Sequence, residues 1–140
     1  MENKKDNNDI SLERLLNYIG LAKKAGALVA GVGLVADAVR KRKAALVFYS
    51  QDISGPSLKK LKDKTSFYNT ELHGLPVGMD DLGQRIGLIR PAAAVCVTDK
   101  SFLPPILDLI NKISSTGEIA KNISSTDTTQ GGALINGTER

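Results

Sequence analysis

The segment ALVAGVGLVADAVRKRKAALVFYS, residues 27–50, places a short strand, a helix and a second strand in direct succession. Ala27–Ala30 is the short apolar strand, and Leu34, Val35, Ala38 and Val39 then recur with helical spacing. Ala44–Tyr49 is continuously apolar, as expected of a strand that is covered on both faces. A sheet covered on both faces needs helices on each side. The segment therefore predicts an α/β protein with a three-layer α/β/α sandwich and a small sheet.

The rest of the chain continues the alternation of helix and strand. The spacing of Leu12, Leu15 and Ile19 predicts a helix that Ser11 caps and Gly26 ends. A final helix begins at Asp99 or Ser101, with two prolines in its first turn, where a missing N–H costs little. The other predicted elements are helices over 54–65 and 80–86 and strands over 70–75 and 92–98.

The length and composition favour one folded domain. A chain of 140 residues with 41% hydrophobic residues can bury one core. We expect a polar N-terminal extension over 1–11, the domain over 12–113 and a flexible Ser/Thr/Gly-rich tail over 114–140. No apolar run has the roughly 20 residues that cross a bilayer, and the start of the chain is polar. We expect a cytoplasmic protein with no membrane partner.

The sequence offers no set of catalytic or metal-binding residues. Its single cysteine, Cys96, lies in an apolar run typical of a buried strand, and its single histidine is His73. A catalytic thiol needs an electropositive, partly exposed setting with a histidine nearby, and the context of neither residue suits this. A single cysteine also cannot form a cysteine-rich zinc site. We therefore expect no enzyme, no metal and no cofactor.

Positive charge is concentrated in one part of the chain. The net charge is +4, but residues 23–64 alone carry ten Lys and Arg and three Asp, a net +7. The densest cluster is Arg40–Lys43, at the predicted end of the helix that begins after Gly33. Such a cluster is either a solvated helix end or a surface that attracts a polyanion. Aromatic residues, at 4%, are too few for a base-stacking sheet.

The turn Gly31-Val32-Gly33 has three interpretations. The glycines can serve the turn alone, or the helix that follows can offer its free N–H groups to an anion. The third is a nucleotide site, because Gly31–Ala36 formally fits the G-x-G-x-x-G/A fingerprint and Asp52 lies where a ribose-binding acid would be. The chain is too short for the second half of a full dinucleotide-binding fold.

The chain resembles the ribosomal L-seven-Ae family, which includes kink-turn RNA-binding proteins, and in particular its small bacterial ribosome-associated members. The likeness covers residues 12–113 in the family's element order and rests on Leu21–Gly31, Ala44–Val47, Leu82–Gly87 and Arg90–Val95. The resemblance implies a mixed four-stranded sheet within the sandwich. It also implies a non-catalytic RNA-binding protein whose partner is ribosomal or other structured RNA.

The resemblance implies where RNA would bind. In RNA-binding members, the turn into the second helix and the loop before the last strand hold a kinked RNA backbone between them, and the end of the second helix lies along the phosphates. Carried onto this sequence, the expected RNA-binding residues are Gly31, Val32, Gly33, Leu34, Arg40, Lys41, Arg42, Ile89, Arg90 and Pro91.

The sequence departs from the family's kink-turn signature, Gly-x-Asn-Glu-x-x-Lys. Gly33, Leu34 and Asp37 stand where the signature has Asn, Glu and Lys. Leu34 cannot hydrogen-bond a base edge, so general RNA affinity is expected rather than strict kink-turn specificity. The alternatives are a protein-interaction module on the same fold, with ribosome-associated proteins as possible partners, and a nucleotide-binding protein.

Overall fold

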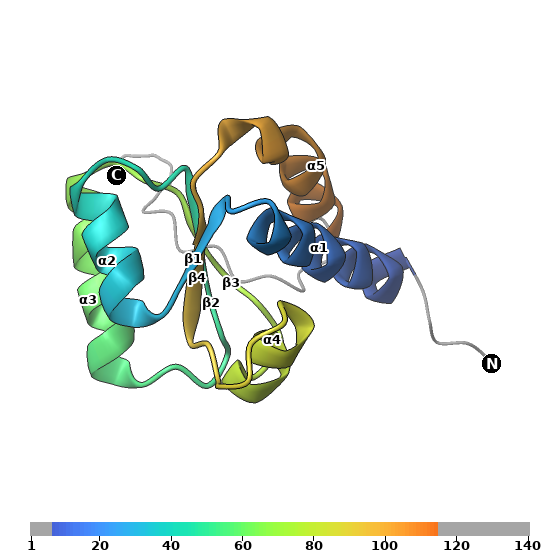
Figure 1. Cartoon of the computed structure of the whole chain (residues 1–140), viewed down its shortest axis with the longest axis horizontal. Helices are drawn as coiled ribbons and strands as arrows, with labels where there is room; N and C mark the ends of the chain where they lie inside the picture. The colour runs from blue at the N-terminus through green and yellow to red at the C-terminus, as the bar shows by residue number, and fades with distance from the viewer. Residues whose placement is uncertain (1–6, 115–140) are drawn as a thin grey trace.

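The computed structural model describes residues 7–114 of the chain, drawn in colour in Figure 1. The elements in chain order are α1 (Asn7–Lys24), β1 (Leu28–Ala30), α2 (Val32–Arg40), β2 (Leu46–Tyr49), α3 (Gly55–Phe67), β3 (Leu72–Gly74), α4 (Met79–Arg85), β4 (Ala94–Val97), the 3-10 helix η1 (Lys100–Phe102) and α5 (Leu103–Ser114).

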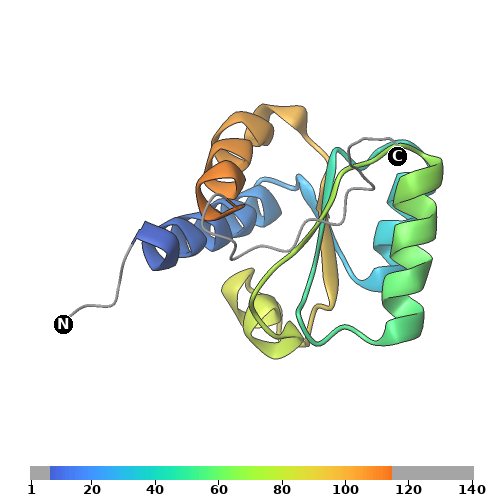
Figure 2. The same ribbon diagram turned by 180° about the vertical axis from the view of Figure 1, so that it is seen from behind.

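The four strands form one mixed sheet in the order β1-β4-β2-β3. β4 is antiparallel to both of its neighbours, and β3 runs parallel to β2 at the edge. Helices α2 and α3 cover one face of the sheet, and α1, α4 and α5 cover the other (Figures 1 and 2). The three-layer α/β/α sandwich and the mixed four-stranded sheet are thus confirmed.

The continuous apolar strands divide their side chains between two cores. In β2, Leu46 and Phe48 pack with α1, α4 and α5, whereas Val47 and Tyr49 pack with α2 and α3. In β4, Val95 lies in the core beneath α1, α4 and α5, and Cys96 lies in the core beneath α2 and α3. Successive side chains of a strand point to opposite faces. This explains why every residue of β2 and β4 is buried.

Four helices end in the same hydrogen-bonded turn. After each, a residue with positive φ donates its N–H to the carbonyl three residues earlier, and the next N–H reaches back five residues. This is the Schellman arrangement, which satisfies the last carbonyls of a helix. The four residues with positive φ are Gly26, Arg42, Asn69 and Gly87. The predicted helix end at Gly26 is confirmed.

The ends of two helices differ from the sequence prediction. α1 begins at Asn7, so Ser11 is not its N-cap but lies within the helix, buried on the same side as Leu15 and Ile19. The helix therefore includes part of the predicted polar extension. At the other end, Asp99 caps η1 by accepting from the Ser101 N–H at 2.9 Å, and α5 starts only at Leu103. Ser114 is the last residue of α5, and the rest of the predicted tail lies outside the described residues.

Candidate nucleic-acid interface

Gly31 joins β1 to α2 in a conformation that favours glycine. Its φ is 111°, in the left-handed half of backbone space that side chains with a Cβ rarely adopt. The Gly31 N–H donates to the Ala94 carbonyl at 2.8 Å, and the Gly31 carbonyl accepts from the Val35 N–H at 2.8 Å. One residue thus ends the pairing of β1 with β4 and starts α2.

A second glycine fixes the loop before β4. A Cβ on Gly83 in α4 would lie 2.3 Å from the Arg90 carbonyl oxygen and 3.2 Å from the Pro91 Cα. The loop is also tied to α4 by the Leu88 N–H, which donates to the Gly83 carbonyl at 2.8 Å, and by the Ala92 N–H, which donates to the Met79 carbonyl at 2.9 Å. Sequence reasoning used Gly83 for the family likeness but missed this role, although a glycine inside a helix is itself a signal of close approach.

The two loops meet at one end of the sheet. β1 and β4 are antiparallel neighbours with Ala30 opposite Val95, so the chain leaves β1 where it enters β4. Residues 31–34 and 88–91 together are called the loop surface below. Leu34 is 59% exposed on it, and Ile89 is fully exposed. The structure thus places at the same end of the sheet (Figure 1) the predicted residues Gly31, Val32, Gly33, Leu34, Ile89, Arg90 and Pro91.

The predicted cations at the end of α2, Arg40, Lys41 and Arg42, do not lie on the loop surface. α2 has nine residues, so about 13 Å of helix separates Gly31 from the cluster Arg40–Lys43. In Figure 1 the loop surface is at the lower end of the sandwich and the last turn of α2 is at the upper end. The glycine turn and these cations therefore do not lie side by side, because the helix between them carries the chain to the other end of the sheet (Figure 1).

The cations of this cluster differ in how they are paired. Asp37 accepts from Arg40 at 2.5 Å and forms an ion pair with Lys41 at 3.0 Å, and the hydrogen bonds from Lys41 and Arg40 lower the pKa of the Asp37 carboxyl. The guanidinium of Arg42 instead lies over the Tyr68 ring, 5.3 Å from its centroid. The residue that replaces the signature lysine thus partly neutralises two of the predicted RNA-binding residues.

Asp52 has a structural role in place of the nucleotide-binding one considered above. Its Oδ1 accepts from the Met79 N–H at 2.9 Å, at the start of α4. β4 also lies between β1 and β2, so the glycine turn and Asp52 do not flank a crevice between neighbouring parallel strands.

The candidate reactive side chains are buried. Cys96 lies in the core, and burial raises the pKa of its thiol to about 11, so it stays protonated at neutral pH. The buried His73 has its Nε2 2.8 Å from a Glu71 carboxylate oxygen, and this hydrogen bond lowers the pKa of Glu71. Within residues 7–114, no three His, Cys, Asp or Glu side chains gather as metal ligands. In the same range, no helix combines the length and apolarity that a membrane span requires.

The three-layer fold, with the loops 31–34 and 88–91 at one end of its sheet, defines a class of small α/β/α proteins. Comparison of the sequence with known families identifies the family within this class. Residues 13–104 match the Ribosomal protein L7Ae/L30e/S12e/Gadd45 family, and the chain belongs to this family. It is similar to the RNA-binding protein YlxQ of Enterococcus faecium, with 33% identity over 103 residues that cover 74% of this chain and 97% of the relative. YlxQ of Bacillus subtilis (strain 168), also named an RNA-binding protein, is 31% identical over 93 residues, which cover 66% of this chain and 91% of that relative.

Two solved structures share the fold. A protein of unknown function from Bacillus halodurans C superposes with a TM-score of 0.64 at 30% identity, covering 69% of this chain and 96% of that chain. The Giardia lamblia 15.5kD RNA binding protein superposes with a TM-score of 0.63, covering 82% and 92%, and its 18% identity limits the likeness to the fold.

Proposed function

We propose that this protein is a non-catalytic, cytoplasmic RNA-binding protein that binds structured RNA through the loop surface. The observation that carries the proposal is that residues 31–34 and 88–91 lie at the same end of the sheet, since Ala30 pairs with Val95, and that the Gly31–Ala94 hydrogen bond and the approach of Arg90 to Gly83 hold each loop in position. Both curated relatives are named RNA-binding proteins. The expected ligand is ribosomal or kink-turn-like RNA.

The chemistry of the loop surface suits contacts with the RNA backbone and with apolar base and sugar faces. Leu34 and Ile89 are exposed apolar side chains, and Arg90 adds a cation between Ile89 and Pro91. Gly33 and Leu34 provide no side-chain donor for a base edge. Binding should therefore depend on RNA shape more than on base identity, and Arg40, Lys41 and Arg42 should add long-range attraction rather than contacts within the same surface.

The test compares a folded RNA that contains a kink-turn with a duplex of equal length. Ile89→Asp and Leu34→Asp should each weaken binding of the folded RNA by about tenfold or more, because a carboxylate would face the phosphates. Leu21→Asp is the matched control, since Leu21 is similarly exposed, at 50%, on α1. Binding is measured by fluorescence anisotropy at fixed salt. If all three variants bind the folded RNA as the unaltered protein does, the proposal that the loop surface binds RNA is wrong.

A second candidate function is a protein-interaction module. The observation in its favour is that the side chains exposed on the loop surface include two large apolar residues, Leu34 and Ile89, which a protein partner could also bury. Capture of ribosome-associated proteins that persists after nuclease treatment, and that Ile89→Asp abolishes, would favour this function over RNA binding.

A further inference from the structure

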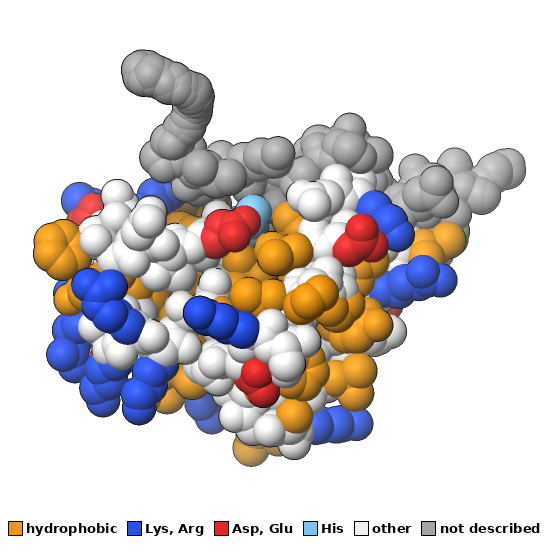
Figure 3. All heavy atoms as spheres, turned by 90° about the horizontal axis from the view of Figure 1, so that it is seen from above, with side chains coloured by type: hydrophobic (Ala, Val, Ile, Leu, Met, Phe, Trp, Pro, Cys, Tyr) orange, Lys and Arg blue, Asp and Glu red, His pale blue; other side chains and the backbone are white. Residues whose placement is uncertain are grey.

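The C-terminal ends of α2 and α3 form a second surface, far from the loop surface, that combines cations with aromatic rings. It is called the basic end here and comprises Arg40–Lys43, Lys64, Phe67 and Tyr68, with Lys60 and Lys62 from the preceding turn of α3 and Lys100 of η1, which lines the same hollow as Arg42. Figure 3 views the molecule from this end, and Lys and Arg side chains gather over α2 and α3 on its left.

The most unusual residue of the basic end is Phe67. It is 79% exposed, at the last position of α3, although a large apolar side chain gains stability from burial. Its ring centroid is 4.8 Å from that of Tyr68, with the planes at 76°. The Arg42 guanidinium lies over the same Tyr68 ring. Phe67, Tyr68 and Arg42 thus form a continuous row of contacts, and the Phe67 ring at its end is exposed to solvent.

The backbone at Arg42 is strained. Its φ is 61°, in the left-handed region, at a turn position where two of the other three helices have glycine. The Schellman turn that ends α2 imposes this φ, as the same turn after α3 does on Asn69. Here the strained residue presents a guanidinium to an aromatic ring.

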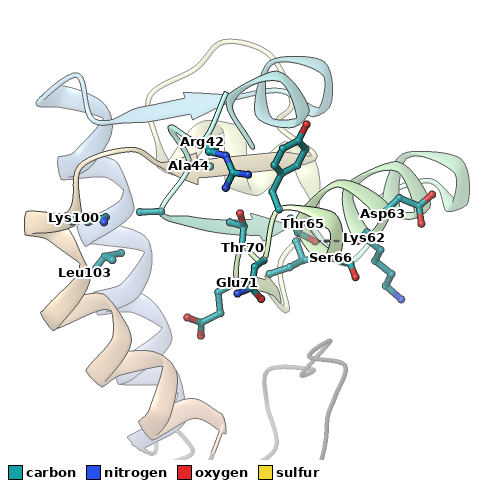
Figure 4. A pocket seen from close by; sticks show the side chains of 14 residues that line it. Arg42, Ala44, Lys62, Asp63, Thr65, Ser66, Thr70, Glu71, Lys100 and Leu103 are labelled. Atoms are coloured by element: carbon teal, nitrogen blue, oxygen red, sulfur yellow. Dashed lines mark hydrogen bonds between the residues drawn. The ribbon is translucent and has the colours of Figure 1, made fainter. Parts of the chain in front are cut away.

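A hollow lies beside this row. Its volume is about 1060 Å³, and its lining includes the cations Arg42, Lys62 and Lys100, the carboxylates Asp63 and Glu71 and the ring of Tyr68. Figure 4 shows the Arg42 side chain directed toward Thr70 across the hollow, while Lys62 extends outward from α3. Asp63 and Glu71 would repel phosphates inside the hollow, so the part of this end that suits a polyanion is the row and the lysines of α3 outside the hollow.

Further lysines continue from the row along α3. Lys60, Lys64 and Phe67 follow the i, i+4, i+7 spacing that places side chains on one face of a helix. Lys59 is paired with Asp63 at 3.0 Å, whereas Lys60, Lys62 and Lys64 form no ion pair with any residue that the structure describes. The charge of Lys60 and Lys64, on the face that leads to Phe67, is therefore available to a chain of phosphates that runs along α3.

We propose that the basic end is a second RNA-binding site and that it takes single-stranded RNA. An exposed ring next to unpaired lysines is the arrangement that holds an unpaired strand, with a base on the ring and phosphates on the cations. A continuous duplex has its base faces stacked inside and would leave Phe67 without a partner. The site does not depend on the loop surface, from which the length of α2 separates it.

The test measures binding of fluorescein-labelled decauridylate to the full chain. Phe67→Ala should weaken binding by about tenfold, and Phe67→Tyr should restore most of it, because stacking needs only an aromatic face. Lys60→Gln and Lys64→Gln should each reduce the slope of log affinity against log salt by about 0.7. Since Phe67 is exposed, its replacement should leave the melting temperature unchanged, which serves as the folding control.

Ile89→Asp is the matched control on the loop surface. It should leave decauridylate binding unchanged, and Phe67→Ala should leave binding of the folded RNA unchanged, so the two proposals fail independently. Equal decauridylate affinity for Phe67→Ala and the unaltered protein would overturn the inference. So would deca-glutamate binding with the same affinity and the same dependence on Phe67, because the site would then accept any polyanion.

Discussion

At the residue scale, Arg42 places a cation at the surface in a backbone conformation that lowers the stability of the fold. The left-handed φ of 61° is unfavourable for a residue with a Cβ, and the cation–π contact with Tyr68 returns only part of that cost. Arg42→Gly should therefore raise the free energy of unfolding by about 0.5–1 kcal/mol, while it weakens binding of single-stranded RNA. Urea denaturation and anisotropy on the same samples measure the two effects.

Asn69 provides the comparison for this prediction. It has φ 58° in the equivalent turn after α3, but asparagine tolerates this region better than arginine does. Asn69→Gly should therefore stabilise the protein less than Arg42→Gly. If Arg42→Gly lowered the free energy of unfolding, the contact with Tyr68 would outweigh the backbone strain.

At the element scale, α4 determines where the loop before β4 lies. Gly83→Ala would place a methyl group 2.3 Å from the Arg90 carbonyl oxygen, closer than any unshifted structure allows, so helix and loop must separate. We expect this variant to lose about 1–3 kcal/mol of unfolding free energy and to bind folded RNA more weakly. Thermal denaturation and anisotropy with the kink-turn RNA check the two parts.

Gly33→Ala tests whether any added methyl group has the same effect. A Cβ on Gly33 meets nothing within 4 Å, and Gly33 lies in the first turn of α2. This variant should keep or slightly raise the free energy of unfolding, because alanine is the better helix former. A stability loss in Gly33→Ala as large as that in Gly83→Ala would show that close packing on Arg90 is not the cause.

At the scale of the whole molecule, the two proposed sites lie at opposite ends of α2. A sandwich of this kind does not need to change shape to expose both, so one molecule should hold folded RNA at the loop surface and an unpaired strand at the basic end. Saturating unlabelled decauridylate should weaken binding of labelled kink-turn RNA only modestly, by about two- to fivefold, because it neutralises the cations that attract the folded RNA from a distance but leaves the loop surface free. The effect should shrink as salt is raised. Full competition between the two RNAs would mean that they share one site.

Local pattern was sufficient for most of the fold. The continuous apolar runs in β2 and β4 predicted strands covered on both faces, and the structure buries all their side chains. The burial of Cys96 was predicted correctly from the apolar run that contains it. The helix end at Gly26 was predicted correctly because a glycine after a helical pattern is itself a local signal. Ser11 was assigned wrongly as a cap because a small polar residue within a helix has the same local signature as one before it.

The candidate sites could be predicted only in part. The family likeness identified the turn at Gly31 and the loop at Ile89–Pro91, and the pairing of β1 with β4 places them together. The association of Phe67, Tyr68 and Arg42 had no signal in the sequence, because Arg42 and Tyr68 are brought together only when α2 packs beside α3. The capping of α4 by Asp52, 27 positions earlier in the chain, was hidden for the same reason.

The amino-acid sequence by itself determined the layers, the burial of the strands and the concentration of positive charge, since each depends on periodicity or composition along a short stretch. Only the tertiary structure decided that the glycine turn meets the loop before β4 and that the cations of α2 lie at the other end, beside the rings of α3. Strand pairing and helix packing join residues distant in the chain, and no local pattern encodes which of them meet.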